Sequence, residues 1–355
     1  MMRRALDLAE LGRYTTHPNP RVGCVIVQDE QIVGEGWHRK WGEPHAEPLA
    51  LNAAGAAARG ATVYVTLEPH SYQSRTPPCT TALINAGVRR VICATLDPNP
   101  QVHGDGLRLL REAGIQVEEG LLADAAHALN AGFEKRHATG MPRVIVKIAA
   151  SLDGRVALAT GESRWITGPA ARADVHRLRA EVSAVLTGID TVLADDPQLT
   201  VRDAGIELLG RQPLRVVLDS KLRVPANARM FAEAGETLVF TREDRVPHTG
   251  SMRASVIGVA ADANGRVELA AVLRELGRRL CNDVLVEAGP TLAGSVIAAG
   301  LADEVLVYLA PMLLGSDAKA MVQLPALQTL QRAPRFRLHE CVQVGDDLKL
   351  RYFPA

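Results

Sequence analysis

The sequence has no excess of charge of either sign. Its 355 residues include 40 Lys and Arg and 40 Asp and Glu, so the formal net charge is zero. A protein that binds a nucleic-acid backbone usually carries a basic excess or a basic stripe. Here the pairs Arg3-Arg4 and Arg89-Arg90 are isolated, which is typical of solvated ends of helices or strands. We therefore expect no nucleic-acid partner.

The sequence also lacks the features of a secreted or membrane-spanning chain. Residues 1–16 contain Asp7 and Glu10 and no uninterrupted apolar core. The longest charge-free apolar stretch, residues 288–302, is interrupted by Gly and Pro and is too short to cross a bilayer. The five cysteines are odd in number and scattered, which favours core thiols or metal ligands over disulfides. We expect a cytoplasmic protein with no membrane partner.

The length and the order of apolar segments predict two α/β domains. A chain of 355 residues exceeds one ordinary domain. Gly140 and Pro142 interrupt a helical pattern, and a new apolar strand starts at residue 144, so the predicted domains are residues 1–140 and 141–355. Alternating strands and helices in each half predict a sheet with helices on both faces. Helices are expected at 2–12, 45–58, up to 86, 104–113, 122–137, 169–180, 267–280 and 290–299, and strands at 22–28, 32–37, 62–66, 89–95, 115–118, 144–150, 183–187, 214–218, 237–241, 283–287 and 303–309.

Residues typical of a zinc deaminase are spaced along the first half. His45 and Glu47 follow a proline at an expected helix start, and Cys79 follows two prolines at another. A thiol at a helix N-terminus has its anion stabilised by free N–H groups and the helix dipole. Zinc deaminases use such a pattern to hold the ion with three protein ligands and a water, while a nearby glutamate transfers protons.

Taken together, the motifs resemble the bifunctional deaminase–reductases of riboflavin biosynthesis. The matching strings in the first half are residues 17–24 (HPNPRVGC), 45–47 (HAE), 66–69 (TLEP), 75–79 (RTPPC) and 97–101 (DPNPQ). The resemblance covers essentially the whole chain. It implies a cytidine-deaminase-like three-layer α/β/α domain followed by an α/β domain similar to dihydrofolate reductase.

The resemblance implies a zinc site, and this chain departs from the family there. His45 and Cys79 match two ligands, Glu47 matches the proton carrier, and Asn19 matches a contact to the pyrimidine. The third ligand, a Cys in the family, is His70 here. A His–His–Cys site is chemically reasonable and one unit more positive than a site with two thiolates. Other family residues are replaced by Leu49, Tyr72, Gln73 and Ser74.

The departures leave two interpretations open. Either the deaminase works with His70 as a ligand, or the chain is a monofunctional reductase whose first domain is degenerate. Two further classes remain as alternatives: a non-catalytic nucleotide-binding protein, and a nucleoside or tRNA-type deaminase with an unrelated appendage. Neutral charge and the motifs of the second half argue against the last of these.

The second half lacks a G-x-G-x-x-G turn after its first strand, so a standard dinucleotide fold has no direct support. Residues 284–294 (VLVEAGPTLAG) instead predict a buried strand, a glycine turn and a helix, whose N-terminal N–H groups suit a pyrophosphate. Residues 147–155 (KIAASLDGR), 161–168 (GESRWITG) and 191–202 (TVLADDPQLTVR) resemble the reductase half of the same family.

That resemblance implies an NADPH site and a substrate site. The cofactor residues would be Ala149, Trp165, Thr191, Asp195, Ser220, Gly289, Pro290, Thr291, Leu292, Ala293, Gly294 and Ser295. The substrate residues would be Ser163, Arg179, Leu199, Arg202 and Glu287. Two arginines on separate elements can hold a ribose phosphate through bidentate hydrogen bonds.

The reaction that the resemblance implies has two steps. A phosphoribosylated diaminopyrimidinone is deaminated by hydrolysis, and NADPH then reduces its ribosyl group to ribityl. We also expect a homo-oligomer, the usual state of a cytosolic biosynthetic enzyme.

Overall fold

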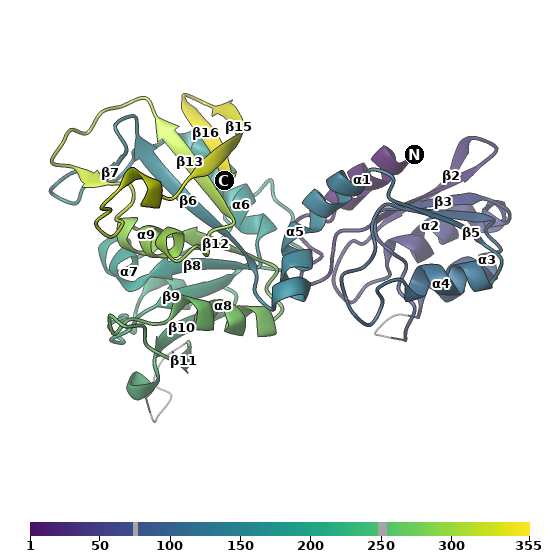
Figure 1. Cartoon of the computed structure of the whole chain (residues 1–355), viewed down its shortest axis with the longest axis horizontal. Coiled ribbons are helices and arrows are strands. Elements are labelled where there is room, and N and C mark those ends of the chain that lie inside the picture. Colours follow the sequence, from purple (N-terminus) through teal and green to yellow (C-terminus); the bar gives the residue numbers. More distant parts are fainter. Residues whose placement is uncertain (74–76, 248–253) are drawn as a thin grey trace. The chain divides into compact units, whose positions relative to one another are not determined.

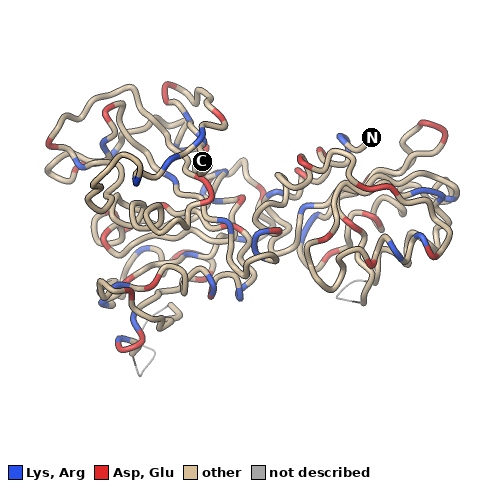
Figure 2. The backbone as a smooth tube through the Cα atoms, in the orientation of Figure 1, with Lys and Arg blue, Asp and Glu red and all other residues tan. Residues whose placement is uncertain are grey.

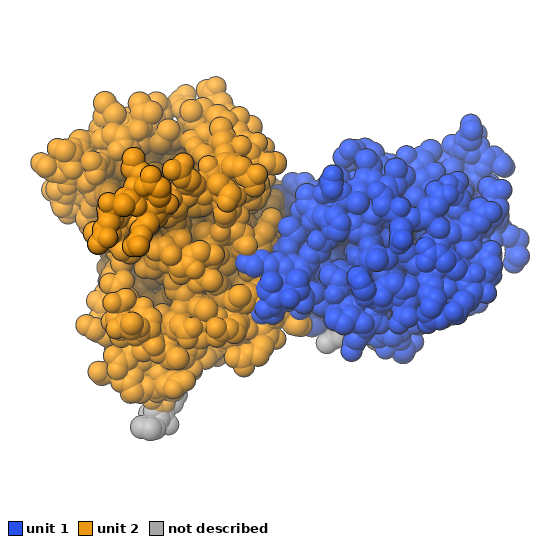
Figure 3. Space-filling model, in the orientation of Figure 1, with its two compact units in different colours: residues 1–140, 207–209 blue, residues 141–206, 210–355 orange. Residues whose placement is uncertain are grey.

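The computed structural model describes residues 1–73, 77–247 and 254–355 and divides the chain into two compact units (Figure 3). Unit 1 comprises residues 1–140 with 207–209, and unit 2 comprises residues 141–206 and 210–355. Basic and acidic residues are interspersed along the described backbone of both units (Figure 2). In the described ranges we find no helix that combines the length and the apolar character needed to cross a membrane.

Unit 1 is a five-stranded sheet with helices on both faces (Figure 1). The strands, in sheet order, are β2 (Gln31–Trp37), β1 (Gly23–Gln28), β3 (Thr62–Val65), β4 (Arg90–Cys93) and β5 (Gln116–Glu119). The helices are α1 (Met2–Glu10), α2 (Ala46–Ala54), α3 (Cys79–Ala86), α4 (Asp105–Glu112) and α5 (Ala123–Thr139). The β1–β2 and β1–β3 pairs are antiparallel, and β3, β4 and β5 are parallel.

The side chains of β1 point alternately into two apolar cores, one on each face of the sheet. Cys24 and Ile26 pack with residues of α2, α3 and α4, whereas Val25 packs with residues of α1 and α5. Successive strand residues face opposite sides of a sheet, so one strand supplies both cores. The three-layer α/β/α architecture expected for the first half is confirmed.

Glycines follow the ends of two helices of unit 1, one at the expected position and one before it. Helix α5 ends at Gly140, whose φ of 72° is the left-handed conformation typical of a helix terminus. Helix α2 ends earlier than predicted, at Ala54, because Gly55 has a φ of 54°, and a short 3-10 helix (Gly55–Ala58) follows.

Unit 2 contains a nine-stranded mixed sheet, again covered by helices on both faces (Figure 1). The strands, in sheet order, are β11 (Ser255–Val259), β10 (Thr237–Arg242), β9 (Leu214–Leu218), β8 (Ala184–Gly188), β12 (Asp283–Glu287), β6 (Arg143–Ser151), β13 (Glu304–Ala310), β16 (Asp347–Pro354) and β15 (Phe336–Val344). Strands β11 to β13 run parallel, and β16 and β15 are antiparallel to their neighbours.

The central strand β6 again divides two cores. Val144, Val146 and Ile148 pack with α8 (Leu269–Arg278) and α9 (Pro290–Ala298) on one face. Ile145 packs with α6 (Pro169–Glu181) and α7 (Ile189–Asp195) on the other. This mixed α/β sheet confirms the fold class expected for the second half.

Several elements of unit 2 were not predicted from the sequence. They are α7, β11, the C-terminal strands β15 and β16, and the short pair β7 (Arg155–Ala157) and β14 (Lys319–Ala320), which forms a separate two-stranded sheet. Strand β15 lies at the sheet edge and carries the exposed polar residues Arg337, His339 and Gln343, so it has no apolar run to reveal it. The described part of the unit also contains three short 3-10 helices: Arg229–Ala232, Glu243–Arg245 and Leu330–Arg332.

Candidate active sites

Two helix starts and one loop bring the predicted metal ligands of unit 1 together. His45 is the N-cap of α2 in an extended conformation, and Glu47 lies in the first turn of that helix, 3% exposed. Cys79 is the first residue of α3, after Pro78. His70 follows the segment that leaves β3 and is buried. The expected helix starts at His45 and Cys79 are confirmed.

The donor atoms of these residues form a compact cluster. Cys79 Sγ lies 3.1 Å from His70 Nδ1 and 3.5 Å from His45 Nδ1. The candidate ligand atoms of all three residues lie within 4.8 Å of one another. In tetrahedral zinc sites, Zn–N bonds of about 2.0 Å and Zn–S bonds of about 2.3 Å place ligand atoms about 3.3–3.6 Å apart. The two measured separations from sulfur are close to this spacing, so the residues present fit a zinc ion.

Burial favours the neutral forms of the side chains in this cluster. Burial, together with His70 and His38, lowers the pKa of His45 to about 3, which leaves its imidazole neutral. Burial raises the pKa of Glu47 to about 7. Burial and the neighbouring Glu47 also raise the pKa of Cys79 well above its usual value, so they outweigh the helix N-terminus that we expected to stabilise the thiolate. Metal binding must therefore release the thiol proton.

A histidine that the sequence analysis missed stands beside this cluster. The ring of His38 lies 5.2 Å from that of His45, and its Nδ1 lies 3.2 Å from the Pro44 carbonyl. When Nδ1–H donates to that carbonyl, Nε2 accepts a hydrogen bond from the Asn19 amide, 3.0 Å away. His38 thereby fixes the orientation of Asn19, the predicted pyrimidine contact. No motif marked His38, because its partners come from separate loops.

The other departures from the family pattern lie around His70. The ring of Tyr72 meets the His70 ring edge-on, with centroids 5.9 Å apart, and is partly exposed. Leu49 lies on α2 and is half-buried, and Gln73 is exposed. Ser74 and the matching residues Arg75 and Thr76 lie outside the described residues.

In unit 2 the predicted cofactor residues gather at one edge of the sheet. Strands β9, β8, β12 and β6 are successive parallel neighbours. Ser220 follows β9, Thr191 follows β8, Gly289 follows β12, and Ala149 lies near the end of β6. Ligands of open α/β sheets bind beyond the carboxyl ends of parallel strands. The chain therefore places these side chains where a cofactor binds in such folds.

Hydrogen bonds connect several of these segments. The Gly289 N–H donates to Thr191 Oγ1 at 3.2 Å. Arg164 donates to the carbonyl of Asp195 at 2.6 Å and to its carboxylate at 3.3 Å, which holds the segment between Ser163 and Trp165 against the end of α7. That helix ends at Asp195, and Asp196 follows in the left-handed conformation, with a φ of 43°. Ser220 Oγ accepts a bond from the Val267 N–H at 3.0 Å.

Trp165 is exposed rather than part of the core. Its side chain is 66% accessible, and the Arg172 guanidinium lies 4.6 Å from its ring centroid. An exposed ring held on one side by a cation is available to stack on a flat ligand. Trp165 is therefore not a core tryptophan.

The first turn of α9 is packed tightly against a distant loop. Gly289 caps the helix and Pro290 opens it, as expected. Thr291 Oγ1 donates to Gln323 Oε1 at 2.9 Å, and Ser295 Oγ donates to the Thr291 carbonyl at 2.8 Å. Leu292 is half-buried, and Ala293 and Gly294 are buried. This turn therefore has a fixed backbone.

Gly294→Ala should disturb that turn. A Cβ at Gly294 would lie 2.0 Å from the Gln323 carbonyl oxygen, a backbone atom that cannot move alone. Overpacking of this kind costs about 1–3 kcal/mol. We expect a lower melting temperature for unit 2 and weaker NADPH binding, measured by calorimetry and by fluorescence titration. An unchanged melting temperature would contradict the tight packing.

Two of the predicted substrate residues, Arg179 and Glu287, form a buried ion pair. Arg179 donates from Nε and Nη2 to the two carboxylate oxygens of Glu287 at 2.6 and 2.9 Å, and from Nη1 to the Thr200 carbonyl at 3.1 Å. Burial, and then the neighbouring Arg179, lower the pKa of Arg202. Leu199 is buried, Ser163 is half-buried, and Arg202 is exposed. The three bonds of Arg179 leave Arg202 as the more accessible cation of the two.

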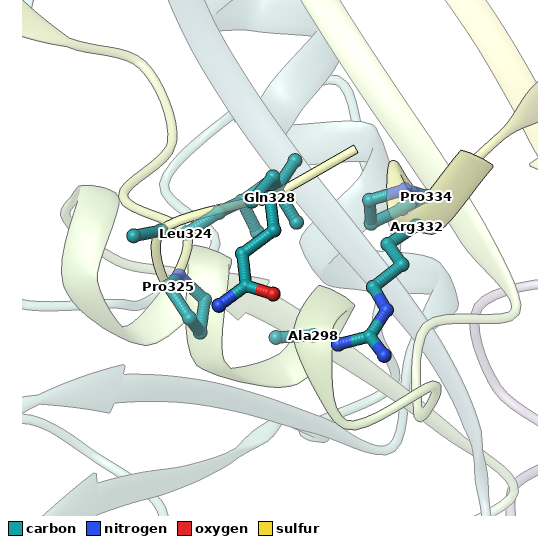
Figure 4. A pocket seen from close by; sticks show the side chains of 8 residues that line it. Ala298, Leu324, Pro325, Gln328, Arg332 and Pro334 are labelled. Carbon is teal, nitrogen blue, oxygen red and sulfur yellow. The ribbon is translucent and has the colours of Figure 1, made fainter. Parts of the chain in front are cut away.

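A cavity of about 310 Å³ in unit 2 lies away from these residues (Figure 4). It is lined by Ala298, at the C-terminal end of α9, and by residues 324–328, Arg332 and Pro334. The start of α9 at Pro290 lies about 12 Å along the helix axis from Ala298, at the helical rise of about 1.5 Å per residue, whereas Ser295 is less than one turn away. We assign the reductase site to the sheet edge where the predicted cofactor residues converge, rather than to this cavity.

Comparisons with known proteins match both units. Residues 1–95 match the family model of the cytidine and deoxycytidylate deaminase zinc-binding region, and residues 142–350 match that of the RibD C-terminal domain. The riboflavin biosynthesis protein RibD of Escherichia coli K12 is 52% identical, covering 100% of this chain and 98% of that protein.

Two solved structures extend the match to the whole fold. RibD of Acinetobacter baumannii (form 1) has a TM-score of 0.93 and 45% identity, covering 100% of this chain and 98% of that one. A diaminohydroxyphosphoribosylaminopyrimidine deaminase/5-amino-6-(5-phosphoribosylamino)uracil reductase of Thermotoga maritima has a TM-score of 0.87 and 34% identity, covering 100% and 97%.

Fold and sites together define a bifunctional enzyme in which a zinc-dependent deaminase domain precedes an NADPH-dependent reductase domain. The chain belongs to the RibD family of riboflavin biosynthesis. The compact His45–His70–Cys79 cluster argues against a degenerate first domain. The match of residues 142–350 excludes an unrelated appendage.

Proposed function

We propose that this chain deaminates 2,5-diamino-6-(5-phosphoribosylamino)pyrimidin-4-one by hydrolysis and then reduces the ribosyl group to ribityl with NADPH. The reaction named for the Thermotoga maritima relative supports this substrate. His45, His70 and Cys79 hold the zinc ion, and the 3.1 Å separation of His70 Nδ1 from Cys79 Sγ is the observation that carries the proposal. When bound, the ion supplies Lewis acidity and lowers the pKa of water.

Glu47 moves the protons of the deamination step. Hydrolysis adds water to the amino-bearing carbon and releases ammonia, so one proton must pass from the water to the leaving amine. Burial raises the pKa of the Glu47 carboxyl to about 7, which lets it accept and release a proton near neutral pH. Asn19, held by His38, orients the pyrimidine through its amide.

The reductase residues bind and orient two ligands. The N-terminal part of α9, from its N-cap Gly289 to Ser295, receives the pyrophosphate of NADPH, and Ala149, Trp165, Thr191, Asp195 and Ser220 line the same edge of the sheet. Ser163, Leu199 and the Arg179–Glu287 pair hold the substrate. Arg202 holds its phosphate, because two neighbouring guanidiniums favour an anion.

The test combines metal analysis of the purified protein with assays of ammonia release and NADPH oxidation. We expect one zinc per chain, ammonia release from the diaminopyrimidinone and NADPH oxidation by the deaminated product. Metal-free protein with no ammonia release but a working reductase would refute the zinc assignment while leaving the reductase intact.

His70→Cys tests the unusual ligand directly. Cysteine restores the donor set of the family, so the variant should retain zinc at least as tightly and keep or raise the rate of ammonia release. His70→Ala removes one of the three ligands and should lose zinc on dialysis against a chelator. Competition with a colorimetric chelator measures retention. Equal zinc retention by wild type and His70→Ala would show that His70 is not a ligand.

We also propose a homo-oligomer in the cytoplasm. All five cysteines lie in the described ranges and are free thiols, which suits a reducing compartment. Closed homo-oligomers are the commonest state of soluble assemblies. Light scattering during size-exclusion chromatography measures the mass, and the mass of a single chain would contradict the oligomer.

A further inference from the structure

The carboxylate of Asp153 joins two loops that are far apart in the sequence. Asp153 lies in the turn after β6. Its Oδ1 accepts hydrogen bonds from the Ser151 hydroxyl at 2.5 Å and the Leu314 N–H at 3.1 Å, and its Oδ2 accepts one from the Gly315 N–H at 2.8 Å. Two successive backbone N–H groups therefore converge on one side-chain anion, which makes strong charge-assisted hydrogen bonds.

Further bonds tie the same two segments, which we call the β7–β14 arm (residues 152–157 and 312–321). The Leu152 N–H donates to the Met312 carbonyl at 2.8 Å, and the Met321 N–H donates to the Gly154 carbonyl at 2.9 Å. The Arg155 guanidinium donates to the Ala318 carbonyl at 3.2 Å, and β7 pairs with β14. Of the side chains in these contacts, only Asp153 is an anion.

The arm continues directly to the first turn of α9. Gln323 follows the arm by two residues, and its N–H donates to the Pro290 carbonyl at 3.1 Å. Its side-chain oxygen accepts a bond from Thr291 Oγ1 at 2.9 Å, and its backbone packs directly on Gly294. Movement of the arm would therefore move the turn that receives the pyrophosphate.

We propose that Asp153 is a positioning residue for NADPH: it fixes the β7–β14 arm and, through Gln323, the backbone of the first turn of α9. This inference rests on the proposed cofactor site at that turn. Asp153 acts through the arm and is not a contact to the reacting atoms. A neutral amide cannot replace it, because an asparagine offers one acceptor oxygen and turns an NH₂ group toward the loop N–H groups.

Asp153→Asn tests this role. We expect the KM for NADPH to rise about 5- to 20-fold with kcat within about twofold, because the lost bonds affect binding rather than the chemical step. Hydrogen exchange of the amides of residues 312–318 should become faster. Ammonia release should be unchanged. Asp153→Glu keeps the carboxylate and should return the KM part of the way to that of the wild type.

Asp317→Asn is the matched control, since Asp317 lies in the same loop and, among the described residues, its carboxylate accepts one long hydrogen bond, from the Ser316 hydroxyl at 3.5 Å. It makes the same change of charge and should leave the KM unchanged. An unchanged KM in Asp153→Asn overturns the proposal, even if the arm exchanges faster. A fall in kcat at constant KM, or an equal rise in KM for Asp317→Asn, overturns it as well.

Hydrogen exchange of the wild type distinguishes failure of the proposed role of Asp153 from failure of the proposed cofactor site. NADPH should protect the amides of residues 289–295, and absence of that protection contradicts the site itself. If protection is present and Asp153→Asn binds NADPH normally, only the role of Asp153 fails. If Asp153→Asn unfolds unit 2, Asp153→Glu replaces it in the test. A folded Asp153→Glu variant whose KM for NADPH differs more from the wild-type value than does the KM of Asp317→Asn supports the proposal. Equal KM values for Asp153→Glu and Asp317→Asn overturn it.

Discussion

Replacing Glu47 with glutamine is expected to reduce ammonia release by on the order of 10²–10⁴-fold, the usual contribution of a positioned general acid–base group. Glutamine has nearly the same shape as glutamate but cannot accept and return a proton. Glu47 is 3% exposed, and burial raises its pKa to about 7, so the carboxyl is poised for transfer near neutral pH. A fixed-time ammonia assay on the diaminopyrimidinone measures the loss.

Two readouts distinguish loss of proton transfer from loss of the site. Zinc content should stay near one per chain, because the ligand atoms belong to His45, His70 and Cys79. NADPH oxidation by the deaminated substrate should also be unchanged. Glu30→Gln, at an exposed turn between β1 and β2, is the control and should release ammonia at the wild-type rate. Wild-type ammonia release by Glu47→Gln would exclude Glu47 as the proton carrier.

Local sequence patterns predicted the metal ligands of the deaminase site. The structure adds contacts between distant segments and the effects of burial, which local patterns do not report. Prolines before His45 and Cys79 indicated helix starts, which are properties of a few neighbouring residues. The pairing of His38 with Asn19 instead depends on how the loop before β1 meets the end of β2. The protonation of Cys79 likewise depends on burial and on Glu47, which no local pattern reports.

In unit 2, too, local patterns predicted the buried elements but not the contacts between distant segments. Apolar strands with helices between them were predictable, because each forms part of a buried layer. The C-terminal hairpin was missed because β15 is exposed along most of its length and mixes apolar with polar residues, without a continuous apolar run. The bidentate Arg179–Glu287 pair joins residues 108 positions apart, and only the register of α6 against β12 brings them together. Sequence analysis had assigned both residues to the substrate without pairing them.

Replacing Glu287 with glutamine should destabilise unit 2 by about 3 kcal/mol, the lower part of the range of about 3–5 kcal/mol for breaking one half of a buried ion pair. The side chains of Arg179 and Glu287 are 13% and 10% exposed. Removing the carboxylate leaves a buried guanidinium whose charge is uncompensated. Reductase activity should fall with stability, whereas ammonia release should be unchanged. Differential scanning calorimetry measures the shift.

The pH dependence gives this prediction a second, independent signature. Burial alone would raise the pKa of Glu287, but Arg179 and Lys147 outweigh it and the pKa is lowered. A lowered carboxyl pKa contributes stability that is present above the unfolded value of about 4.3 and is lost as the pH falls through the folded value. Glu287→Gln should therefore remove part of the acid sensitivity of unit 2. Asp244→Asn, which disrupts the exposed pair with Arg242, should change neither the melting temperature nor its acid dependence appreciably. Equal unfolding of Glu287→Gln and wild type at neutral pH would contradict a stabilising role for the buried pair.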